Sequence, residues 1–347
     1  MDILDDPRAM ALQDPQGMLE AIYGLPQQCR QAWQEAQTWD LPPWGPIDKI
    51  VVLGMGGSAI AADYVATLPL HGPLLTVRGY EMPTWLDHTT LVVASSYSGQ
   101  TEETLSAFRQ ALLAPVAKAV ITTDGQLLDM ARQHGVPAFL VKFRGQPRAA
   151  LGYSLMPLLA LASKVGMIAH IHEQVEEAIS LMEEEAKALG PEVAESPAKA
   201  LARRLKGRLV VVYGAQYLAP VARRFKTQVN ENAKAWAFWE ELPEADHNAV
   251  LGYGLPTQVA GLTTVVMLRG QGMHPRILLR YHFTRRLLEE AGVDVQEIEA
   301  KGQSPLAQML SSTLLLDYAS CYLAFLNQVD PTSTYAIDRL KRWMSQV

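Results

Sequence analysis

Two loops rich in glycine and serine stand in the first third of the chain, and their residue types suit the binding of an anion. The glycine loop is Gly54-Met-Gly-Gly-Ser58 and the serine loop is Ser95-Ser-Tyr-Ser-Gly-Gln-Thr101. Each follows an apolar run typical of a strand and precedes a stretch typical of a helix. At a helix start the backbone N–H groups lack intrahelical partners and the helix dipole favours negative charge, so an anion is held without a lysine. The two loops therefore predict a phosphate-binding site.

Backbone and hydroxyl groups of these loops are the predicted phosphate contacts. Glycine allows the backbone to approach a ligand closely, and serine and threonine add hydroxyl donors. The residues concerned are Gly56, Gly57, Ser58, Ser96, Ser98 and Thr101. The glycine loop alone also fits the dinucleotide fingerprint G-x-G-x-x-A, and serines are ordinary helix caps. A pair of such loops at the ends of neighbouring strands favours a ligand site over two ordinary helix caps, because ligands of open α/β sheets bind outside the carboxyl ends of the strands.

Proton transfer is the second chemistry that the sequence offers. Glu231 lies in Asn230-Glu-Asn-Ala-Lys234 at the end of a predicted helix, and His247 lies in a polar loop further on. A carboxylate and an imidazole in one cleft move protons at neutral pH, the first as a base at carbon and the second at an oxygen. The alternative is that Glu231 is a solvated helix residue and His247 a loop cap, because glutamate is mostly exposed and a lone histidine is usually structural.

The elements that must position these residues alternate between strands and helices. A helical lead-in is predicted to end at a proline-rich stop near residue 46. Strands are then predicted at 49–53, 74–77, 91–94, 117–122 and 138–141. Their alternation with helices is the pattern of a doubly wound parallel sheet. Helical periodicity follows from 148 to 206, with an interruption near Gly190 and Pro191.

A weak internal repeat begins at residue 208. Residues 208–214 match the rhythm of 49–54, and we interpret the repeat as a pseudo-duplication. The second copy carries Ala-Gln-Tyr where the first carries Met-Gly-Gly, which predicts a single phosphate site per chain. The predicted domains are a lead-in (1–48), a first α/β domain with the phosphate loops (49–150), a helical bridge (151–207) and a second α/β domain with a C-terminal helix (208–347).

Composition excludes several classes of protein. With 347 residues, 19% of them charged, and a net charge of −6, the chain has no broad basic field for nucleic acid or an anionic membrane. Cys29 and Cys321 do not form a disulfide framework, which favours a reducing cytosol. The histidines show no ligand spacing, so no metal is predicted. The start of the chain does not resemble a signal peptide, and the apolar stretch Ala149–Met167 predicts a buried helix, so no transmembrane segment is expected.

The motifs in combination resemble those of the bifunctional phosphoglucose/phosphomannose isomerases, which are built from two sugar-isomerase (SIS) domains. The motifs are G-M-G-G-S, S-S-Y-S-G-x-T-E-E-T, P-R-A-A-L-G-Y, N-E-N-A-K with P-E-x-x-H-N, and V-D-P-T with I-D-R-L-K. The resemblance covers nearly the whole chain. It implies an α/β fold of two doubly wound SIS-type domains, each a mostly parallel sheet flanked by helices.

The resemblance also implies a role for each candidate residue. The six loop residues named above match positions that hold the sugar phosphate. Glu231 matches the base that moves a proton between C2 and C1, and His247 matches the ring-opening residue, which reaches in from the other subunit of a homodimer. Arg148 matches the cation that steadies the enediolate, and Lys341 matches a lysine of the C-terminal helix. Thr334 matches a small residue that makes room for both epimers. Gln100 and Gln228 depart from the commonest family pattern.

The implied function is a cytoplasmic aldose–ketose isomerase. It interconverts glucose 6-phosphate and mannose 6-phosphate with fructose 6-phosphate through a cis-enediolate, with no cofactor or metal and no nucleic-acid or membrane partner. One alternative is a non-catalytic sugar-phosphate-binding SIS protein or regulator, which usually carries a helix-turn-helix that this sequence lacks. The other is an NADP-dependent oxidoreductase that uses Gly54, Gly56 and Ala59, with Arg78 at the 2′-phosphate. That alternative leaves the serine loop unexplained.

Overall fold

The computed structural model describes residues 2–344 and 346, and it divides the chain into two compact units. One unit comprises residues 24–183 and 302–309, and the other comprises residues 1–23, 184–301 and 310–347. We call them the first-sheet unit and the second-sheet unit, because each contains one parallel sheet. The domain bounds predicted from the sequence remain a prediction.

The chain opens with a helical lead-in, as predicted. It consists of a 3₁₀ turn, η1 (Ile3–Asp5), and the helices α1 (Pro7–Gln13), α2 (Met18–Tyr23) and α3 (Leu25–Gln37). Asp6 caps α1 by accepting hydrogen bonds from the N–H groups of Arg8 and Ala9, 3.0 and 3.2 Å away. The proline-rich residues 41–46 form no helix or strand, which confirms the predicted stop.

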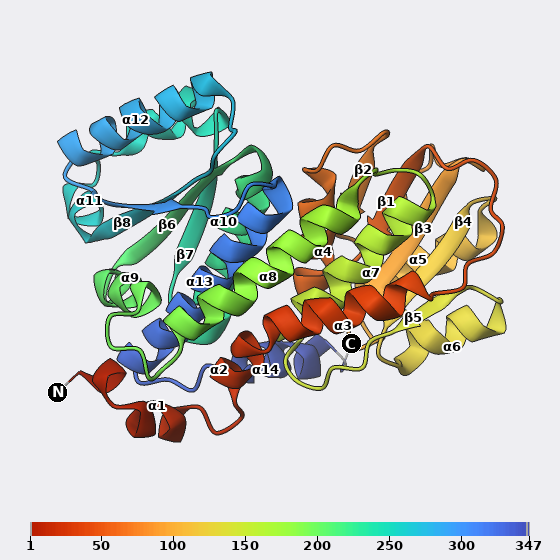
Figure 1. Cartoon of the computed structure of the whole chain (residues 1–347), viewed down its shortest axis with the longest axis horizontal. Coiled ribbons are helices and arrows are strands. Elements are labelled where there is room, and N and C mark those ends of the chain that lie inside the picture. The colour runs from red at the N-terminus through yellow and green to blue at the C-terminus, as the bar shows by residue number, and fades with distance from the viewer. Residues whose placement is uncertain (1, 345, 347) are drawn as a thin grey trace. The chain divides into compact units, whose positions relative to one another are not determined.

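The first sheet has five parallel strands in the order β2-β1-β3-β4-β5 (Figure 1). They are β1 (Lys49–Leu53), β2 (Leu74–Val77), β3 (Thr90–Ser96), β4 (Ala117–Thr122) and β5 (Ala138–Leu140). All five were predicted, and β1, β2 and β4 have the predicted bounds. Continuous apolar runs such as Ile50–Leu53 form central strands because both faces of a doubly wound sheet are covered.

Helices cover both faces of this sheet. On one face Val51 and Leu53 of β1 pack in a core with Phe108 of α5 (Glu102–Leu113) and Leu127 of α6 (Gly125–Gln133). On the other face α4 (Gly56–Ala66) contacts β1, β2 and β3, and α7 (Leu151–Lys164) packs against α4 and α3. Residues 151–162 of α7 are all buried, so the prediction of a buried helix in this apolar stretch is confirmed.

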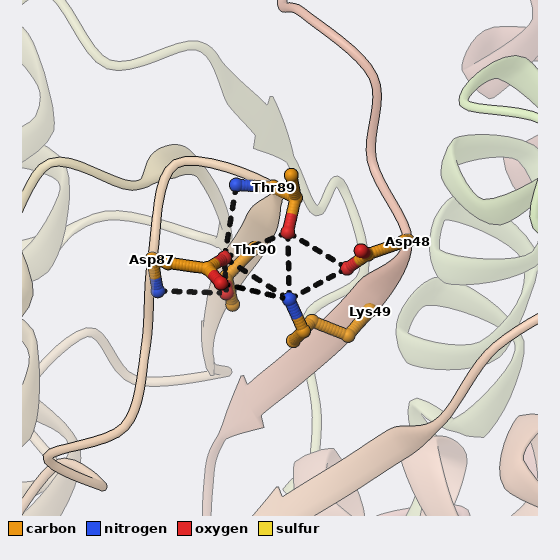
Figure 2. Close-up of polar contacts among 5 residues, drawn as sticks. All are labelled: Asp48, Lys49, Asp87, Thr89 and Thr90. Atoms are coloured by element: carbon orange, nitrogen blue, oxygen red, sulfur yellow. Dashed lines mark hydrogen bonds and ion pairs between the residues drawn. The ribbon is translucent and has the colours of Figure 1, made fainter.

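A polar cluster fixes the amino ends of β1 and β3 (Figure 2). Lys49 Nζ donates to Thr89 Oγ1 at 2.6 Å and to Asp87 Oδ1 at 3.0 Å, and it pairs with Asp48 Oδ1 at 2.6 Å. Hydrogen bonds from Thr89 and Lys49 hold the pKa of the Asp87 carboxyl below its usual range. Since Lys49 is paired with Thr90 in the parallel register, the cluster fixes the register of β1 and β3, whose other ends carry the glycine and serine loops.

The second sheet repeats the strand order of the first. Its four parallel strands run β7-β6-β8-β9, which is the order β2-β1-β3-β4 of the first copy. They are β6 (Leu209–Ala215), β7 (Ala237–Leu242), β8 (Thr263–Arg269) and β9 (Asp294–Glu299). The shared order supports the pseudo-duplication. Strand β7 was not predicted, and its second half, from Glu240 to Leu242, was interpreted only as part of a candidate site.

The remaining helices connect and cover these strands. They are α8 (Ile171–Leu189), α9 (Pro197–Leu205), α10 (Ala219–Ala233), α11 (Thr257–Leu262), α12 (Pro275–Glu290), α13 (Pro305–Leu326) and α14 (Tyr335–Met344). Among the described residues one helix, α13, is long and apolar enough to cross a membrane, and 94% of its most apolar stretch is buried within the protein. The sequence prediction of no transmembrane segment was argued from Ala149–Met167 and did not consider the length and hydropathy of α13.

A buried ion pair joins α10 to α13. Arg224 Nη2 lies 2.5 Å from Asp317 Oδ2, and Gln228 Nε2 donates to Asp317 Oδ1 at 3.0 Å. All three residues are at most 3% exposed. A buried carboxylate needs such partners, because an unpaired buried charge is strongly destabilising. Gln228, noted above as a departure from the family pattern, therefore belongs to the core of the second-sheet unit.

Candidate active site

The glycine loop forms the turn between β1 and α4. Gly56 has φ +50°, a conformation that favours glycine, and a side chain built there would meet no atom within 4 Å. At Gly54 a Cβ would lie 3.0 Å from Ser95 O, so this glycine lets the two loops pack closely. Among the described residues no side chain caps the start of α4. The first N–H groups of this helix are therefore suited to an anionic ligand.

The serine loop forms the turn between β3 and α5. Ser96 Oγ and Thr101 Oγ1 lie 2.8 Å apart, and Ser98 Oγ accepts from Gln100 N at 3.2 Å. Ser58 and Ser96 are buried and Ser98 is exposed. Gly99 has φ +63°, and a Cβ there would collide with Asp124 O. The turn that presents Ser98 therefore requires glycine at position 99.

The strand order explains why these two loops meet. In the order β2-β1-β3-β4-β5 the chain reverses direction of winding between β1 and β3, and ligands of open α/β sheets bind at such a switch point. The common dinucleotide-binding order 3-2-1-4-5-6 is different. Arg78, which the oxidoreductase alternative requires at a 2′-phosphate, is paired with Asp63 of α4. Both observations weigh against that alternative.

Arg148 is brought to the glycine loop by the short 3₁₀ turn η2 (Pro147–Ala149). A Cβ at Gly57 would lie 3.2 Å from Pro147 O and 3.8 Å from Arg148 Cα, so the two segments pack closely. Arg148 is 4% exposed, and its Nη1 donates to Gln146 Oε1 at 3.3 Å. A buried guanidinium beside an anion site can stabilise negative charge.

The serine loop also fixes the segment that leads to Arg148. Tyr97 OH donates to Phe143 O at 3.0 Å and accepts from Gly145 N at 3.0 Å. Tyr97 O in turn accepts from Thr123 Oγ1 at 2.6 Å. The structure therefore gathers the glycine loop, the serine loop and Arg148 in one region of the first-sheet unit. No local sequence signal pointed to the role of Tyr97, because its partners are distant along the chain.

Glu231 lies near the end of α10, between two asparagines that fix the local backbone. Asn230 Nδ2 donates to Ala235 O at 2.8 Å, and the buried Asn232 Nδ2 donates to Ser320 Oγ at 2.9 Å. Lys234 ends the helix at φ +53° and donates to Glu231 O at 2.7 Å. The polar residues of this motif thus hold the helix end in place. Glu231 itself is partly exposed.

His247 ends the 3₁₀ turn η4 (Glu244–His247), which follows β7 directly. It is exposed and is also flanked by residues that fix the backbone. Asp246 accepts from Arg280 and Thr284 of α12, both at 2.8 Å. Asn248 Nδ2 donates to Glu244 Oε1 at 3.0 Å and its Oδ1 accepts from Ala249 N at 2.6 Å.

The structure does not bring Glu231 and His247 of one chain together. Helix α10 connects the parallel strands β6 and β7, so its end lies at the amino edge of the second sheet. His247 lies beyond the carboxyl end of β7. The six residues of β7 span roughly 20 Å, at about 3.3 Å per residue. The two candidate residues of one chain therefore lie at opposite edges of the second sheet.

Thr334 and Lys341 belong to the C-terminal helix. Thr334 precedes α14, and its Oγ1 donates to Asp338 Oδ2 at 3.0 Å. Lys341 lies in the last turn of α14 and is exposed. These residues share the second-sheet unit with Glu231 and His247, whereas the phosphate loops and Arg148 lie in the first-sheet unit. The structure places each set within its own unit, and the assigned roles stay a prediction.

The equivalent switch point of the second sheet is filled by side chains. Gln216 aligns with Gly56 and has the same φ of +50°. Its Oε1 accepts from His274 N at 3.0 Å, and Tyr217 OH donates to Gln271 O at 2.8 Å. These bonds join the loop after β6 to the loop after β8. The sequence predicted the loss of the anion loop here but not what replaces it.

Within residues 2–344 and 346, no group of three or more histidine, cysteine, aspartate and glutamate side chains is arranged to hold a metal ion. The two cysteines, Cys29 and Cys321, are buried and free. Burial raises the pKa of the Cys29 thiol to about 12, so this cysteine remains a thiol at neutral pH.

Comparison with known proteins gives consistent results. Residues 194–344 match the bacterial phospho-glucose isomerase C-terminal SIS domain. The chain is 37% identical over 337 residues to a bifunctional phosphoglucose/phosphomannose isomerase of Caldicellulosiruptor bescii, covering 95% of this chain and 99% of that protein. It is 33% identical over 300 residues to a protein of the same name from Aquifex aeolicus, covering 85% and 90%.

Solved structures share the fold. A hypothetical protein from Thermus thermophilus is similar with a TM-score of 0.76 at 20% identity, covering 99% of this chain and 94% of that chain. The C-terminal domain of glucosamine-fructose-6-phosphate aminotransferase from Francisella tularensis is similar with a TM-score of 0.68 at 15% identity, covering 91% and 98%. The predicted α/β fold with parallel sheets flanked by helices is thereby confirmed.

Proposed function

The chain belongs to the bifunctional phosphoglucose/phosphomannose isomerase family, and we propose from this membership that it interconverts glucose 6-phosphate and mannose 6-phosphate with fructose 6-phosphate. The observation that carries the proposal is the pairing of the glycine and serine loops at one switch point, with Arg148 packed beside them. Such a site suits a sugar phosphate. The two relatives align with 95% and 85% of this chain, and both are named as isomerases of these sugars.

The proposed reaction begins with binding of the phosphate by the two loops. His247 then assists ring opening by moving a proton between the ring oxygen and the C1 hydroxyl. Glu231 removes the proton at C2 to give a cis-enediolate and returns it to C1. Arg148 and Lys341 stabilise the negative charge that develops on the oxygens at C1 and C2. Binding of the remote phosphate orients the reacting carbons.

The separation of Glu231 and His247 supports a homodimer with shared active sites. Because they lie at opposite edges of one sheet, a site that contains both takes His247 from a second copy of the chain. Large apolar side chains are exposed on the elements beside His247, which suits such a contact. They include Leu251 and Leu255, on and after η5 (Ala249–Gly252), and Leu279 and Phe283 on α12. Buried free cysteines and a phosphosugar substrate fit a cytosolic enzyme.

A coupled assay with each of the two aldose phosphates tests the reaction. We expect both to be converted to fructose 6-phosphate. A purified, folded chain that is inert towards both sugars would contradict the proposal and favour a non-catalytic sugar-phosphate-binding protein.

Co-expression of Glu231→Gln and His247→Ala subunits tests the shared site. Each homodimer should be inactive, whereas a mixed dimer has one site built from the two unmodified residues. With random pairing the mixture should recover about a quarter of wild-type activity, given one intact site per mixed dimer and twofold symmetry. No recovery from verified mixed dimers would show that each chain builds its own site.

Dual specificity follows from the enediolate, in which C2 is planar and the two aldoses lose their difference. A small residue at position 334 leaves room for the opened chain to rotate about C2–C3. We expect Thr334→Gln to lower kcat/KM for mannose 6-phosphate more than for glucose 6-phosphate. Thr334→Ser, which keeps the hydroxyl that bonds Asp338, serves as the control. Equal losses for both sugars in Thr334→Gln would contradict the role in specificity.

A further inference from the structure

His247 lies on a very short element that needs support from outside. The turn η4 has four residues, and His247 is its last and is exposed. Among the described residues no side chain caps the start of η4. An imidazole on such a turn has no fixed position unless neighbouring side chains supply it.

Asp246 supplies the contact between this turn and α12. Its Oδ2 accepts from Arg280 Nη1 and its Oδ1 from Thr284 Oγ1, both at 2.8 Å. The two partners are four residues apart, so they lie on the same face of α12. The Asp246 side chain is 14% exposed and Thr284 is buried. A carboxylate that uses both oxygens in charge-assisted and neutral hydrogen bonds fixes the turn in position and in orientation.

We propose that Asp246 is a positioning residue that holds the imidazole of His247 for ring opening. This inference rests on the proposed isomerase function. The same helix presents Leu279 and Phe283 on the surface beside the turn, so α12 both fixes His247 and carries apolar side chains of the proposed subunit contact. Asp246 thereby sets the place of the imidazole relative to the second copy. Asp246 touches α12 and has no assigned contact with the substrate.

The test replaces each half of this contact. Asp246→Asn removes the charge and one acceptor oxygen, and Arg280→Met removes the guanidinium while keeping the aliphatic stem. We expect kcat for glucose 6-phosphate to fall about 10- to 100-fold in both variants, the loss typical of a small misplacement of a catalytic group. KM and inhibition by 6-phosphogluconate, an open-chain sugar-acid phosphate that needs no ring opening, should stay within about twofold because the phosphate loops are intact. Arg280→Lys should restore most of the activity.

Asp294 provides a matched control. Like Asp246, it joins a threonine and an arginine, accepting from Thr264 Oγ1 at 3.0 Å and from Arg204 Nη2 at 2.6 Å. It belongs to the same unit and begins β9, away from the turn of His247 in sequence. Asp294→Asn should therefore match Asp246→Asn in any loss of stability while keeping wild-type kcat.

Wild type and His247→Ala are measured alongside, so that the two proposals fail separately. An inactive wild type would remove the proposed function and with it this inference. A fully active His247→Ala would remove the role of His247, and with it this inference, while the isomerase function stands. If His247→Ala is impaired but folded Asp246→Asn and Arg280→Met both keep wild-type kcat, the positioning role is overturned while the isomerase function stands. If Asp246→Asn does not fold, Arg280→Met decides alone, because the Arg280 side chain is 35% exposed and its replacement should cost less stability.

Discussion

Four strands of the first sheet have the same order as the four strands of the second, but different residues occupy the two switch points. In the first sheet Gly56 leaves open space at φ +50°. In the second sheet Gln216 has the same φ, and its side chain bonds the neighbouring loop. Tyr217 makes a second such bond and is 8% exposed. The two switch points share this backbone geometry, and they differ in the side chains that occupy them.

The candidate phosphate-binding residues and the candidate proton-transfer residues belong to different units of the chain. A doubly wound sheet offers a binding position at its switch point whatever the sequence, and the residues of the loops decide whether it is used. In the second copy the candidate catalytic residues lie elsewhere, at the end of α10 and after β7. We therefore expect substitutions in the first sheet to change binding and substitutions at Glu231 to change turnover.

The largest effect is expected from Glu231→Gln. The variant keeps the size and hydrogen-bonding capacity of the side chain but removes its basicity, so turnover should fall by about 10²- to 10⁴-fold. Binding of fructose 6-phosphate, measured by calorimetry, should change little because the phosphate loops are untouched. Asn230 and Asn232 still fix the helix end. A variant that keeps more than about a tenth of wild-type turnover would contradict the assignment of Glu231 as the base.

Gly56→Gln transfers the residue of the second switch point to the first. Gln216 shows that glutamine is accommodated at φ +50°, and a Cβ at Gly56 meets no atom within 4 Å. The chain should fold, but the new side chain should occupy the space for the phosphate. We expect KM to rise about 100-fold, as for the loss of one or two hydrogen bonds to a charged group.

Gly135→Gln is the control for this transfer. Gly135 also has a positive φ, +62°, and open space around its Cβ position, but it lies in the turn before β5. Both variants have a similar conformational cost, so they should lose similar stability. Only Gly56→Gln should lose binding. Equal KM values in the two variants would show that the phosphate binds away from the glycine loop.

Much of the fold could be predicted from the sequence, and the exception is informative. The bounds of β1, β2 and β4 were located correctly because these strands are continuous, mostly apolar runs. Strand β7 was not predicted because it is an edge strand that carries Glu240 and Glu241. Burial raises the pKa of the partly buried Glu240 carboxyl, although the sequence signal of this segment is that of a polar loop. An edge strand is covered less completely than a central one, so it tolerates polar residues that interrupt the apolar run on which the prediction relies.

The site could be predicted in part, for a similar reason. The phosphate loops follow recognisable strands, so their meeting at a switch point follows from local signals. The separation of Glu231 and His247 does not, because it depends on the unrecognised strand β7 between them. The bonds of Gln216 and Tyr217 likewise join residues more than fifty positions apart. No local pattern encodes such contacts.

A smaller effect is expected from Ser98→Asp, which tests the serine loop. Ser98 is exposed on the turn and accepts from Gln100 N at 3.2 Å, a bond that aspartate can keep. Its carboxylate would face the phosphate dianion, and solvent at this exposed position would screen part of the repulsion. We expect inhibition by sugar phosphates to weaken about tenfold, and less so at high salt. Ser98→Ala separates loss of the hydroxyl from added charge, and unchanged inhibition in Ser98→Asp would place the anion elsewhere.

The smallest effect, and the one that tests the filled switch point itself, is expected from Tyr217→Phe. The variant removes the hydroxyl that donates to Gln271 O. The free energy of unfolding should therefore fall by about 1 kcal/mol near neutral pH, the usual net value of one hydrogen bond.

The stability difference should also depend on pH. Burial, and secondarily the charge of Glu299, raises the pKa of Tyr217 from 10.0 to about 12. A group with a raised pKa in the folded state contributes stability that is fully present below its unfolded pKa and is lost as the pH rises through the folded value. The stability difference between wild type and Tyr217→Phe, measured by urea unfolding, should therefore narrow between about pH 10 and about pH 12.

Because the rest of the second switch point remains filled, wild type and variant should each bind one fructose 6-phosphate per chain. A second binding event in Tyr217→Phe would show that a single hydroxyl, rather than the whole set of side chains, keeps the second copy closed.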